Sequence, residues 1–360
     1  MQCPHMPRVS LRTVAAEVGY SKQTVSLALR GSPLVPPPTA ELVKKAAAKL
    51  GYRSNPILSA IMAQIGATGD LRFHGKLALL NAYRDRDAFR THATIPTYVR
   101  GCEQRAGERG YSFDRFWLHE PRLSVDRWIS ILRTRGTRGL VVVGLMDGKK
   151  LPPHLAPLWQ AFPAIVTGVR TSNPALSLSC VDHHDLIVQA FAKALALGYR
   201  RPALVIKDRI DELVECRFSA AMLACQRGLP AARRIPAFTR IDQARTNRTV
   251  FFDWLDTHRP DVLLSLYNVV FPWLKERALR VPADIGVIQL EWRDNQRKVA
   301  GMDQHNDLVG EAAVDMLVGM IQRNESGLPA APRATLLTAS WVDGQSVRDA
   351  PKNARCAPSQ

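Results

Sequence analysis

The chain has few cysteines and no long apolar run. Its six cysteines lie far apart and form no C-x-x-C pair, so we expect reduced thiols and neither disulfides nor a zinc site. The apolar runs are strand-sized, such as 140–143, and none is long enough to span a bilayer. Residues 1–10 contain two prolines and no apolar core of a signal peptide. We therefore expect a cytoplasmic protein without a membrane partner.

The common catalytic motifs are also missing. The chain has no Walker glycine loop, no G-x-S-x-G and no H-E-x-x-H. His183, His184 and Asp185 suggest a metal site, but three consecutive residues of a helix point in different directions and cannot hold one ion together. Ordinary surface polarity explains them better. We expect no catalytic residue, no metal site and no cofactor.

Positively charged residues are abundant and indicate the class of binding partner. The chain has 49 Lys and Arg against 32 Asp and Glu, a formal net charge of +17. Lys and Arg gain binding energy by releasing counterions from phosphates, which favours a polyanionic partner. Residues 1–65 contain eight basic residues but only Glu17 and Glu41 as acids. The positive excess of this segment favours a polyanionic partner for this part of the chain.

Residues 11–30 contain the most informative pattern. Ser10 can cap a first helix and Gly19 can end it, and apolar residues recur at i, i+3, i+4 and i+7 between them: Leu11, Val14, Ala15 and Val18. Ser21 can cap a second helix, which turns Val25, Ala28 and Leu29 to one side. Its other side has donors suited to base edges and phosphates, beside one apolar residue: Lys22, Gln23, Ser26, Leu27 and Arg30. This pattern predicts a helix-turn-helix; the alternative is a helical hairpin with a solvated polar face.

The wider segment 9–56 resembles the DNA-binding domain of the LacI/GalR family of bacterial transcription regulators. The matching pieces are Val9-Ser10-Leu11, Val14-Ala15, Gly19-Tyr20-Ser21, Gln23-Thr24-Val25-Ser26, Gly31-Ser32 before Val35, and Leu50-Gly51-Tyr52-Arg53-Ser54-Asn55-Pro56. The resemblance implies a homodimer that binds double-stranded operator DNA. The DNA contacts that we expect are Ser10, Ser21, Lys22, Gln23, Thr24, Ser26, Leu27, Arg30, Tyr52, Asn55, Leu58, Ile61 and Met62.

Two further elements complete this region. Three prolines at 36–38 predict an extended arm, and a third helix should follow with a buried stripe of Leu42, Val43, Ala46 and Leu50. Asn55, Pro56 and Gly66 then frame a short helix over 56–65. In the family this hinge helix orders on the operator and inserts an apolar side chain into the minor groove, which implies Ile61, or its neighbour Met62, for that role. The alternative is a linker helix against the core.

From Gly75 onward, apolar strands alternate with helices. The predicted strands are 77–80, 111–118, 139–144, 164–166, 203–206, 262–266 and 285–290, and the predicted helices are 98–108, 125–135, 186–197, 215–227 and 250–258. This alternation predicts an α/β core of two doubly wound subdomains. Pieces such as Leu197-Gly198-Tyr199-Arg200-Arg201 and Arg259-Pro260-Asp261 also resemble the periplasmic-binding-protein-like core of the same family.

The predicted domains follow from these patterns. The division of the core into two halves is implied by the resemblance to the family. They are a helix-turn-helix domain at 8–55, a hinge helix at 56–66, a dimerisation and effector-binding core at 75–345 and a disordered tail at 346–360. Within the core, one subdomain comprises about 75–168 and 299–325, and the other about 169–298 and 326–345. The chain should cross between the halves near Gly168, Val299 and Ser326.

A ligand of such a core should bind where strand ends meet between the halves. The loop 83–94 should line one wall. Arg217 matches the arginine with which the family holds effector hydroxyls or carboxylates, and Glu291 and Asn268 stand where Asp is common. With Tyr267 and Trp292 as aromatic neighbours, these residues suggest a small-molecule effector of the carbohydrate class. In the alternative, all five only shape the surface between the halves.

Taken together, the patterns and the resemblance predict a sequence-specific transcriptional regulator. An effector in the core should control its operator affinity, with repression as the expected effect. The competing hypothesis is a cytoplasmic solute-binding or sugar-converting protein. A secretion signal or a pair of catalytic carboxylates would favour it, and the sequence offers neither.

Overall fold

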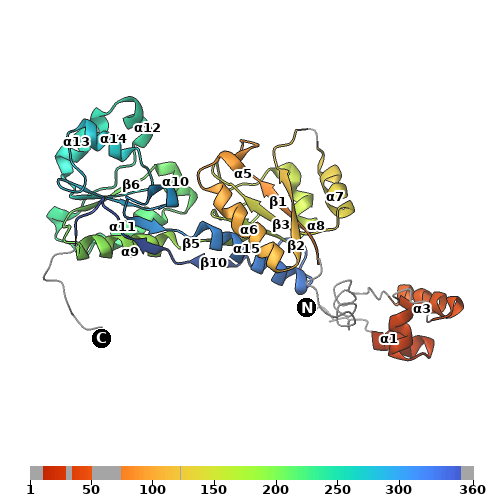
Figure 1. The fold of residues 1–360 in the computed structure, drawn as a ribbon. Helices are drawn as coiled ribbons and strands as arrows, with labels where there is room; N and C mark the ends of the chain where they lie inside the picture. The colour runs from red at the N-terminus through yellow and green to blue at the C-terminus, as the bar shows by residue number, and fades with distance from the viewer. Residues whose placement is uncertain (1–10, 30–34, 51–73, 122, 350–360) are drawn as a thin grey trace, which may run out of the picture. The chain divides into compact units, whose positions relative to one another are not determined.

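A computed structural model describes residues 11–29, 35–50, 74–121 and 123–349 (Figure 1). The chain divides into two compact units, residues 1–74 and 75–360. Each unit is described by itself. No helix among the described residues is long and apolar enough to cross a membrane.

The first unit contains the predicted helix-turn-helix. Its described helices are α1 (Leu11–Val18), α2 (Lys22–Leu29) and α3 (Pro37–Lys49). Gly19 ends α1 with a φ of +69°, a conformation that a residue without a β-carbon adopts easily. The Ser21 hydroxyl accepts a hydrogen bond from the Thr24 N–H at 3.1 Å and so caps α2. Apolar residues of all three helices, and of the turn before α3, form one core: Val14, Ala15, Val25, Ala28, Val35, Val43 and Ala47.

Three details of this unit differ from the prediction. Helix α3 begins at Pro37, since proline is tolerated in a first helical turn where its missing N–H needs no partner, so an extended arm over 36–38 was wrong. Leu42 is 50% exposed, and Ala47 takes its place in the core. Leu27 is half-buried against the core and does not stand on the open face of α2.

The second unit has two largely parallel sheets. The first has the order β10-β5-β4-β3-β1-β2 and consists of β1 (Gly75–Asn81), β2 (Tyr111–Trp117), β3 (Thr137–Val143), β4 (Ala164–Thr167), β5 (Ser177–Val181) and β10 (Ala334–Leu337). The second has the order β11-β9-β8-β7-β6 and consists of β6 (Pro202–Val205), β7 (Val262–Ser265), β8 (Gly286–Gln289), β9 (Gly301–Asp303) and β11 (Ser340–Val342). Only β11, which pairs antiparallel with β9, breaks the pattern among the described pairs. The predicted fold class is confirmed.

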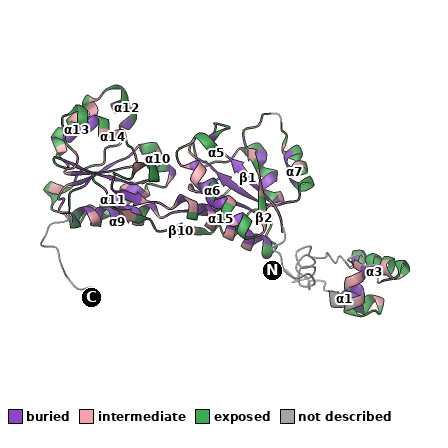
Figure 2. Cartoon of the chain, in the orientation of Figure 1, coloured by how far each residue is buried: buried purple, intermediate pink, exposed green. Residues whose placement is uncertain are grey.

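Helices cover both faces of each sheet, so the inner strands are largely buried, whereas the edge strands β2, β10 and β11 are partly exposed (Figure 2). Over the first sheet, α7 (Val125–Thr134) and α8 (Ala156–Ala161) cover one face, and α6 (Ile95–Glu108) and α15 (Asn306–Gln322) cover the other. Over the second sheet, α9 (His183–Ala196) and α11 (Arg217–Gln226) lie opposite α12 (Ile241–Thr246), α13 (Thr249–His258) and α14 (Val270–Glu276). Two short helices, α5 (Ala88–Thr91) and α10 (Asp208–Leu213), follow strands β1 and β6.

The chain crosses between the two halves later than predicted. The crossings lie after β5, between β9 and α15, and between β10 and β11. The first half therefore comprises 75–181 and 306–337. The predicted crossings near Gly168 and Ser326 were wrong, whereas the one predicted near Val299 lies only a few residues later, between Asp303 and Asn306. The cause is that β5 and β10 extend the first sheet, although their short sequences mix small, polar and apolar residues.

The tail also begins later than predicted. Ser346 and Val347 are buried, and the Ser346 hydroxyl donates to the Val287 carbonyl at 2.6 Å. Disorder from residue 346 was thus wrong for 346–349, which belong to the second half. Residues 350–360 lie outside the described part of the chain.

Candidate DNA-binding helices and ligand-binding cleft

Helix α2 presents part of the predicted DNA-binding face. Lys22 is exposed at its first turn, and the Ser21 hydroxyl lies 2.9 Å from the Thr24 hydroxyl. Gln23 and Ser26 lie within α2, but their side chains are outside the description, as are Ser10, Arg30, Tyr52, Asn55, Leu58, Ile61 and Met62. The base contacts and the hinge helix over 56–65 therefore remain predictions.

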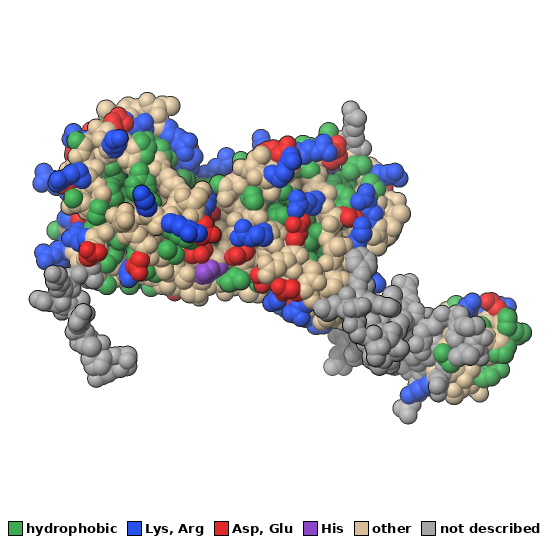
Figure 3. Space-filling view, in the orientation of Figure 1, with side chains coloured by type: hydrophobic (Ala, Val, Ile, Leu, Met, Phe, Trp, Pro, Cys, Tyr) green, Lys and Arg blue, Asp and Glu red, His purple; other side chains and the backbone are tan. Residues whose placement is uncertain are grey.

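Two exposed lysines of α3 form ion pairs within the first unit. Lys44 pairs with Glu41 at 3.2 Å and Lys49 pairs with Glu17 of α1 at 3.0 Å. Both pairs are exposed to solvent, so each contributes little to stability. In the second unit, basic side chains are scattered over the visible face, without one dominant patch (Figure 3).

The two halves of the second unit meet at a cleft, visible as a notch between its lobes (Figure 3). In a parallel sheet all carboxyl ends of the strands lie at one edge. Lys207, Tyr267 and Glu291 come after β6, β7 and β8 in the second half. In the first half, the loop 83–94 follows β1 and Asp147 follows β3. The strand ends of the second half thus present polar side chains toward this cleft.

Arg293 forms a direct hydrogen bond across the cleft. Its Nη2 donates to the Thr94 hydroxyl at 3.1 Å and lies 2.8 Å from the Glu291 carboxylate. A second bridge joins Arg209 of α10 to Asp147, at 2.9 Å from Nη2 to the backbone carbonyl and 3.2 Å to the carboxylate. In both bridges the cation comes from the second half.

His92 fixes the position of Thr94. Its Nδ1 accepts hydrogen bonds from the backbone N–H of Thr94 at 3.1 Å and of Ile95 at 3.3 Å. Burial lowers the pKa of His92, although the Glu291 carboxylate opposes that shift. The neutral ring with a free lone pair on Nδ1 is the form that this geometry requires.

Glu291 lies in a polar group that is almost enclosed. Its side chain is 14% exposed, and Oε1 accepts from the Asn306 amide at 3.4 Å. The Oδ1 atom of Asn306 and the Oε1 atom of Gln289 are buried without a hydrogen-bond partner among the described residues. Buried polar atoms of this kind need partners, and a ligand or water with hydroxyl donors would supply them.

Arg217 lies in a different local group from Glu291. Its Nε is 3.8 Å from the Glu215 carboxylate, which Arg170 also approaches at 3.3 Å. These side chains line a cavity of about 10 Å³ between the halves. The structure pairs Arg217 with Glu215, two residues away, and shows no ion pair between Arg217 and Glu291, both of which it describes.

His183, one of the three residues considered as metal ligands, is a core residue beside Arg217. Its ring packs on that of Phe218 at 4.8 Å, and burial, together with the Arg217 charge, lowers its pKa to about 4. Asp182 caps α9 by accepting from the N–H groups of His184 and Asp185. Among the residues described, no group of His, Cys, Asp and Glu could hold a metal ion.

The two aromatic residues of the predicted site are already engaged. The Tyr267 hydroxyl accepts from the Lys207 N–H at 3.4 Å, and burial raises its pKa to about 12. The Trp292 indole donates to the Val299 carbonyl at 3.0 Å. Asn268 is exposed next to Tyr267. The structure thus brings Tyr267, Asn268, Glu291 and Trp292 to the strand ends of the second half. Arg217 lies apart from them, at the small cavity between the halves.

Two models of known protein families match this chain. The model of the lacI family of bacterial regulatory proteins matches residues 10–55, and the model of a periplasmic binding protein-like domain matches residues 191–347. The chain has a DNA-binding domain of the LacI family. It is therefore a DNA-binding transcriptional regulator with a periplasmic-binding-protein-like core.

Solved structures of LacI-family regulators share this fold. A complex of the regulator CelR with cellobiose is 20% identical over 94% of this chain and 100% of its own, with a TM-score of 0.55. The lac repressor dimer bound to operator and an anti-inducer is also 20% identical, over 95% and 100%, with a TM-score of 0.54. A regulator-like protein from Staphylococcus haemolyticus is 14% identical over 76% and 98%, with a TM-score of 0.56. No curated protein matches the chain.

Sequence reasoning missed most of the residues that connect the halves. Arg293, Arg209 and Asp147 were not predicted, whereas His92 and Thr94 lie in the loop 83–94 that was expected to line one wall of the cleft. Asp147 and Arg209 follow strands, so the rule that sites gather at strand ends could have indicated them. Nothing in the sequence pairs Thr94 with Arg293, because they are 199 positions apart.

Proposed function

We propose that this LacI-family regulator binds a small hydroxylated effector of the carbohydrate class in the cleft of its core, and that the effector changes its affinity for operator DNA. We further propose that it acts as a cytoplasmic homodimeric repressor without catalytic activity. Dimer symmetry then matches two operator half-sites. In the related CelR structure the bound molecule is cellobiose, which supports the choice of ligand class.

One observation carries the proposal. The guanidinium of Arg293 binds Glu291 of its own half and Thr94 of the other half, so the cleft-side acceptors are held by a contact between the halves. A ligand hydroxyl that binds Glu291, or the unpartnered oxygen of Asn306, acts on that same contact. A ligand that alters this contact binds with a different free energy when the contact is formed and when it is broken. Such a difference in binding free energy is the condition for allosteric control.

The test begins with a thermal-shift screen of mono- and disaccharides against the full chain. A sugar that raises the Tm is then added to a fluorescence-anisotropy titration of operator DNA. We expect the operator Kd to change about 5- to 150-fold, the usual range of allosteric coupling. Arg217→Ala should remove this change while leaving operator affinity without sugar intact.

Arg227→Ala is the matched control, because Arg227 is exposed at the other end of the same helix, α11. It should respond to the sugar as the parent protein does. If Arg217→Ala also responds normally, Arg217 does not hold the effector and serves only as the ion partner of Glu215. If no sugar raises the Tm, the carbohydrate class is refuted.

A further inference from the structure

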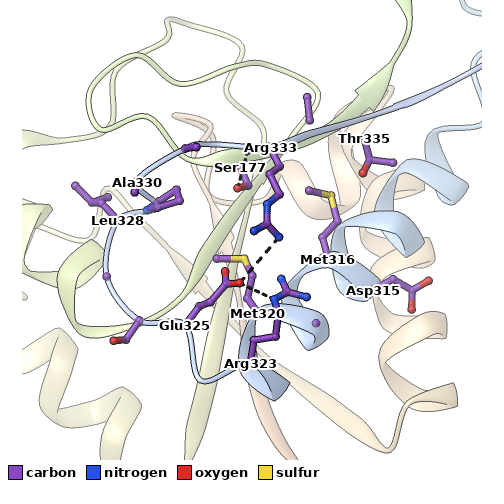
Figure 4. Close-up of a pocket in the computed structure, with 16 residues that line it drawn as sticks. Ser177, Asp315, Met316, Met320, Arg323, Glu325, Leu328, Ala330, Arg333 and Thr335 are labelled. Carbon is purple, nitrogen blue, oxygen red and sulfur yellow. Dashed lines mark hydrogen bonds and ion pairs between the residues drawn. The ribbon is translucent and has the colours of Figure 1, made fainter. Parts of the chain in front are cut away.

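A second pocket lies in the first half of the core, away from the strand ends that form the cleft. It has a volume of about 650 Å³, within the range of about 300–1,000 Å³ that is usual for small-molecule sites. Its walls are the last turns of α15, the starts of β5 and β10, and the loop 324–333 (Figure 4). In a parallel sheet the strand starts lie at the edge opposite to the strand ends.

Hydrogen bonds fix the loop that closes this pocket. The Glu325 N–H donates to the Met320 carbonyl at 3.0 Å and so ends α15. The Arg333 N–H donates to the Ser177 hydroxyl at 3.1 Å, and the Leu178 N–H donates to the Arg333 carbonyl at 2.8 Å. Because both ends of the loop are tied to the fold, the pocket is formed before any ligand arrives.

Two guanidinium groups share one carboxylate in this pocket (Figure 4). Arg323 lies 2.6 Å from Glu325, whereas Arg333 lies 4.0 Å from the same carboxylate and is 67% exposed. The other acid of the lining, Asp315, is bound by Arg105 at 2.9 Å and by Arg109 at 2.8 Å. Among the described residues, Arg333 has no nearer carboxylate, so its planar pair of donors is available.

The rest of the lining is apolar and adaptable. Met316 and Met320 project from α15 into the pocket, and Leu328 stands on the loop opposite them (Figure 4). Leu328 is 38% exposed and Met320 is buried. Methionine side chains adjust to irregular ligand shapes. A charged end and an apolar end therefore lie within one cavity.

We propose that this pocket is a second ligand site, which binds a small organic anion, a phosphate monoester or a carboxylate, with an apolar group. Arg333 binds the anion through two parallel N–H···O bonds, and the apolar group packs against Met316, Met320 and Leu328. The site is spatially separate from that of the proposed carbohydrate effector, since it shares no lining residue with the cleft. It occupies the edge of the sheet at which β1 begins, immediately after the DNA-binding unit in the chain.

The test is isothermal titration calorimetry of the full chain at low salt with four probes. Phenyl phosphate and benzoate represent the two anion classes, benzyl alcohol lacks the charge, and inorganic phosphate lacks the apolar group. We expect one of the two aromatic anions to bind at least tenfold more tightly than benzyl alcohol and inorganic phosphate. The tighter of the two identifies the class.

The variants locate the binding. Arg333→Gln should weaken the preferred anion about tenfold or more, and Arg333→Lys should restore only part of the loss because lysine has no fork of donors. Arg297→Gln, at an exposed arginine of the other half, should bind as the parent does. Equal affinities of the Arg333→Gln and Arg297→Gln proteins, or equal binding of benzyl alcohol and the anions, would overturn the proposal. So would the absence of binding by both aromatic anions.

Discussion

Arg293 forms a side-chain hydrogen bond between the two halves of the core. Removing its side chain in Arg293→Ala deletes a hydrogen bond to Thr94, and such a bond contributes about 0.5–1.5 kcal/mol. The population with separated halves should therefore rise by roughly 2- to 13-fold. Hydrogen exchange should report this as faster exchange of the Thr94 and Ile95 amides.

Arg297→Ala provides the comparison, because Arg297 is exposed four residues further along. Its amide exchange at 94 and 95 should match that of the parent protein. Unchanged exchange in Arg293→Ala as well would show that the halves stay together without this contact. In that case the remaining contacts between the halves, among them Arg209–Asp147 and Arg170–Glu215, are sufficient.

His183 makes the stability of the core depend on pH. Its pKa is lowered from 6.5 to about 4 in the folded chain, so between these values the unfolded state binds a proton that the folded state does not. Stability should therefore fall as the pH decreases from 6.5 towards 4, by at most about 1.4 kcal/mol per pH unit. Above pH 6.5 this residue contributes no pH dependence.

Urea unfolding of the full chain at pH 4.5, 5.5 and 6.5 measures this slope. His183→Phe keeps an aromatic ring beside Phe218 and removes the titrating group. The slope of its unfolding free energy against pH should be smaller by up to about 1.4 kcal/mol per pH unit over this range, which corresponds to one proton. An identical slope in the two proteins would exclude His183 as the source.

Among the elements, α2 is the one whose predicted role can be tested at single positions. If Lys22 and Gln23 contact base edges, alanine at either should cost about 1–3 kcal/mol on the operator and little on random DNA. Lys44→Ala is the control, since Lys44 is exposed on α3 and paired with Glu41. Equal losses on both DNAs would rule out base readout, and filter binding or anisotropy measures both.

Helices α6 and α15 pack together through glycine. A β-carbon on Gly310 would overlap the carbonyl oxygen of Tyr98, and one on Gly101 would overlap that of Asp307. Gly310→Ala should thus destabilise the core by about 1–3 kcal/mol or more, the usual cost of overpacking. Gly107→Ala, where a β-carbon meets nothing within 4 Å, should be neutral or stabilising because alanine favours helix. Thermal unfolding of the two variants distinguishes these outcomes.

The same elements show what the sequence could predict. Strands β1 and β3 are continuous apolar runs, and their positions agree with prediction within two residues. Helix α15 escaped prediction because apolar residues occur on most of its surface and no side chain caps its start. Strands β5 and β10 are short and mix small, polar and apolar residues, so their sequences resemble loops. Periodicity detects an element only when one of its faces differs from the other.

For the whole molecule, the order of strands and helices was sufficient to predict two doubly wound halves and a site at their strand ends. Topology alone indicates only this edge of the sheet; Glu291 was named there through the resemblance to the family, and Tyr267 as its aromatic neighbour. The partners could not be found: Arg217 binds Glu215, and Glu291 binds Arg293. Which of several nearby charges pair depends on side-chain directions that spacing along the chain does not encode.

Helix α15 has a consequence for the molecule as a whole. Asn306 at its first turn binds Glu291 in the cleft, and Arg323 at its last turn borders the second pocket, so its 17 residues join two places about 25 Å apart. Its backbone packs closely against that of α6 at Gly101 and Gly310, and close packing of this kind transmits displacements. If both proposed ligands bind and either one displaces this helix, the two sites are coupled, and each ligand must then alter the affinity of the other by the same factor. Operator binding would in that case depend on the combination of two ligands and not on either one alone.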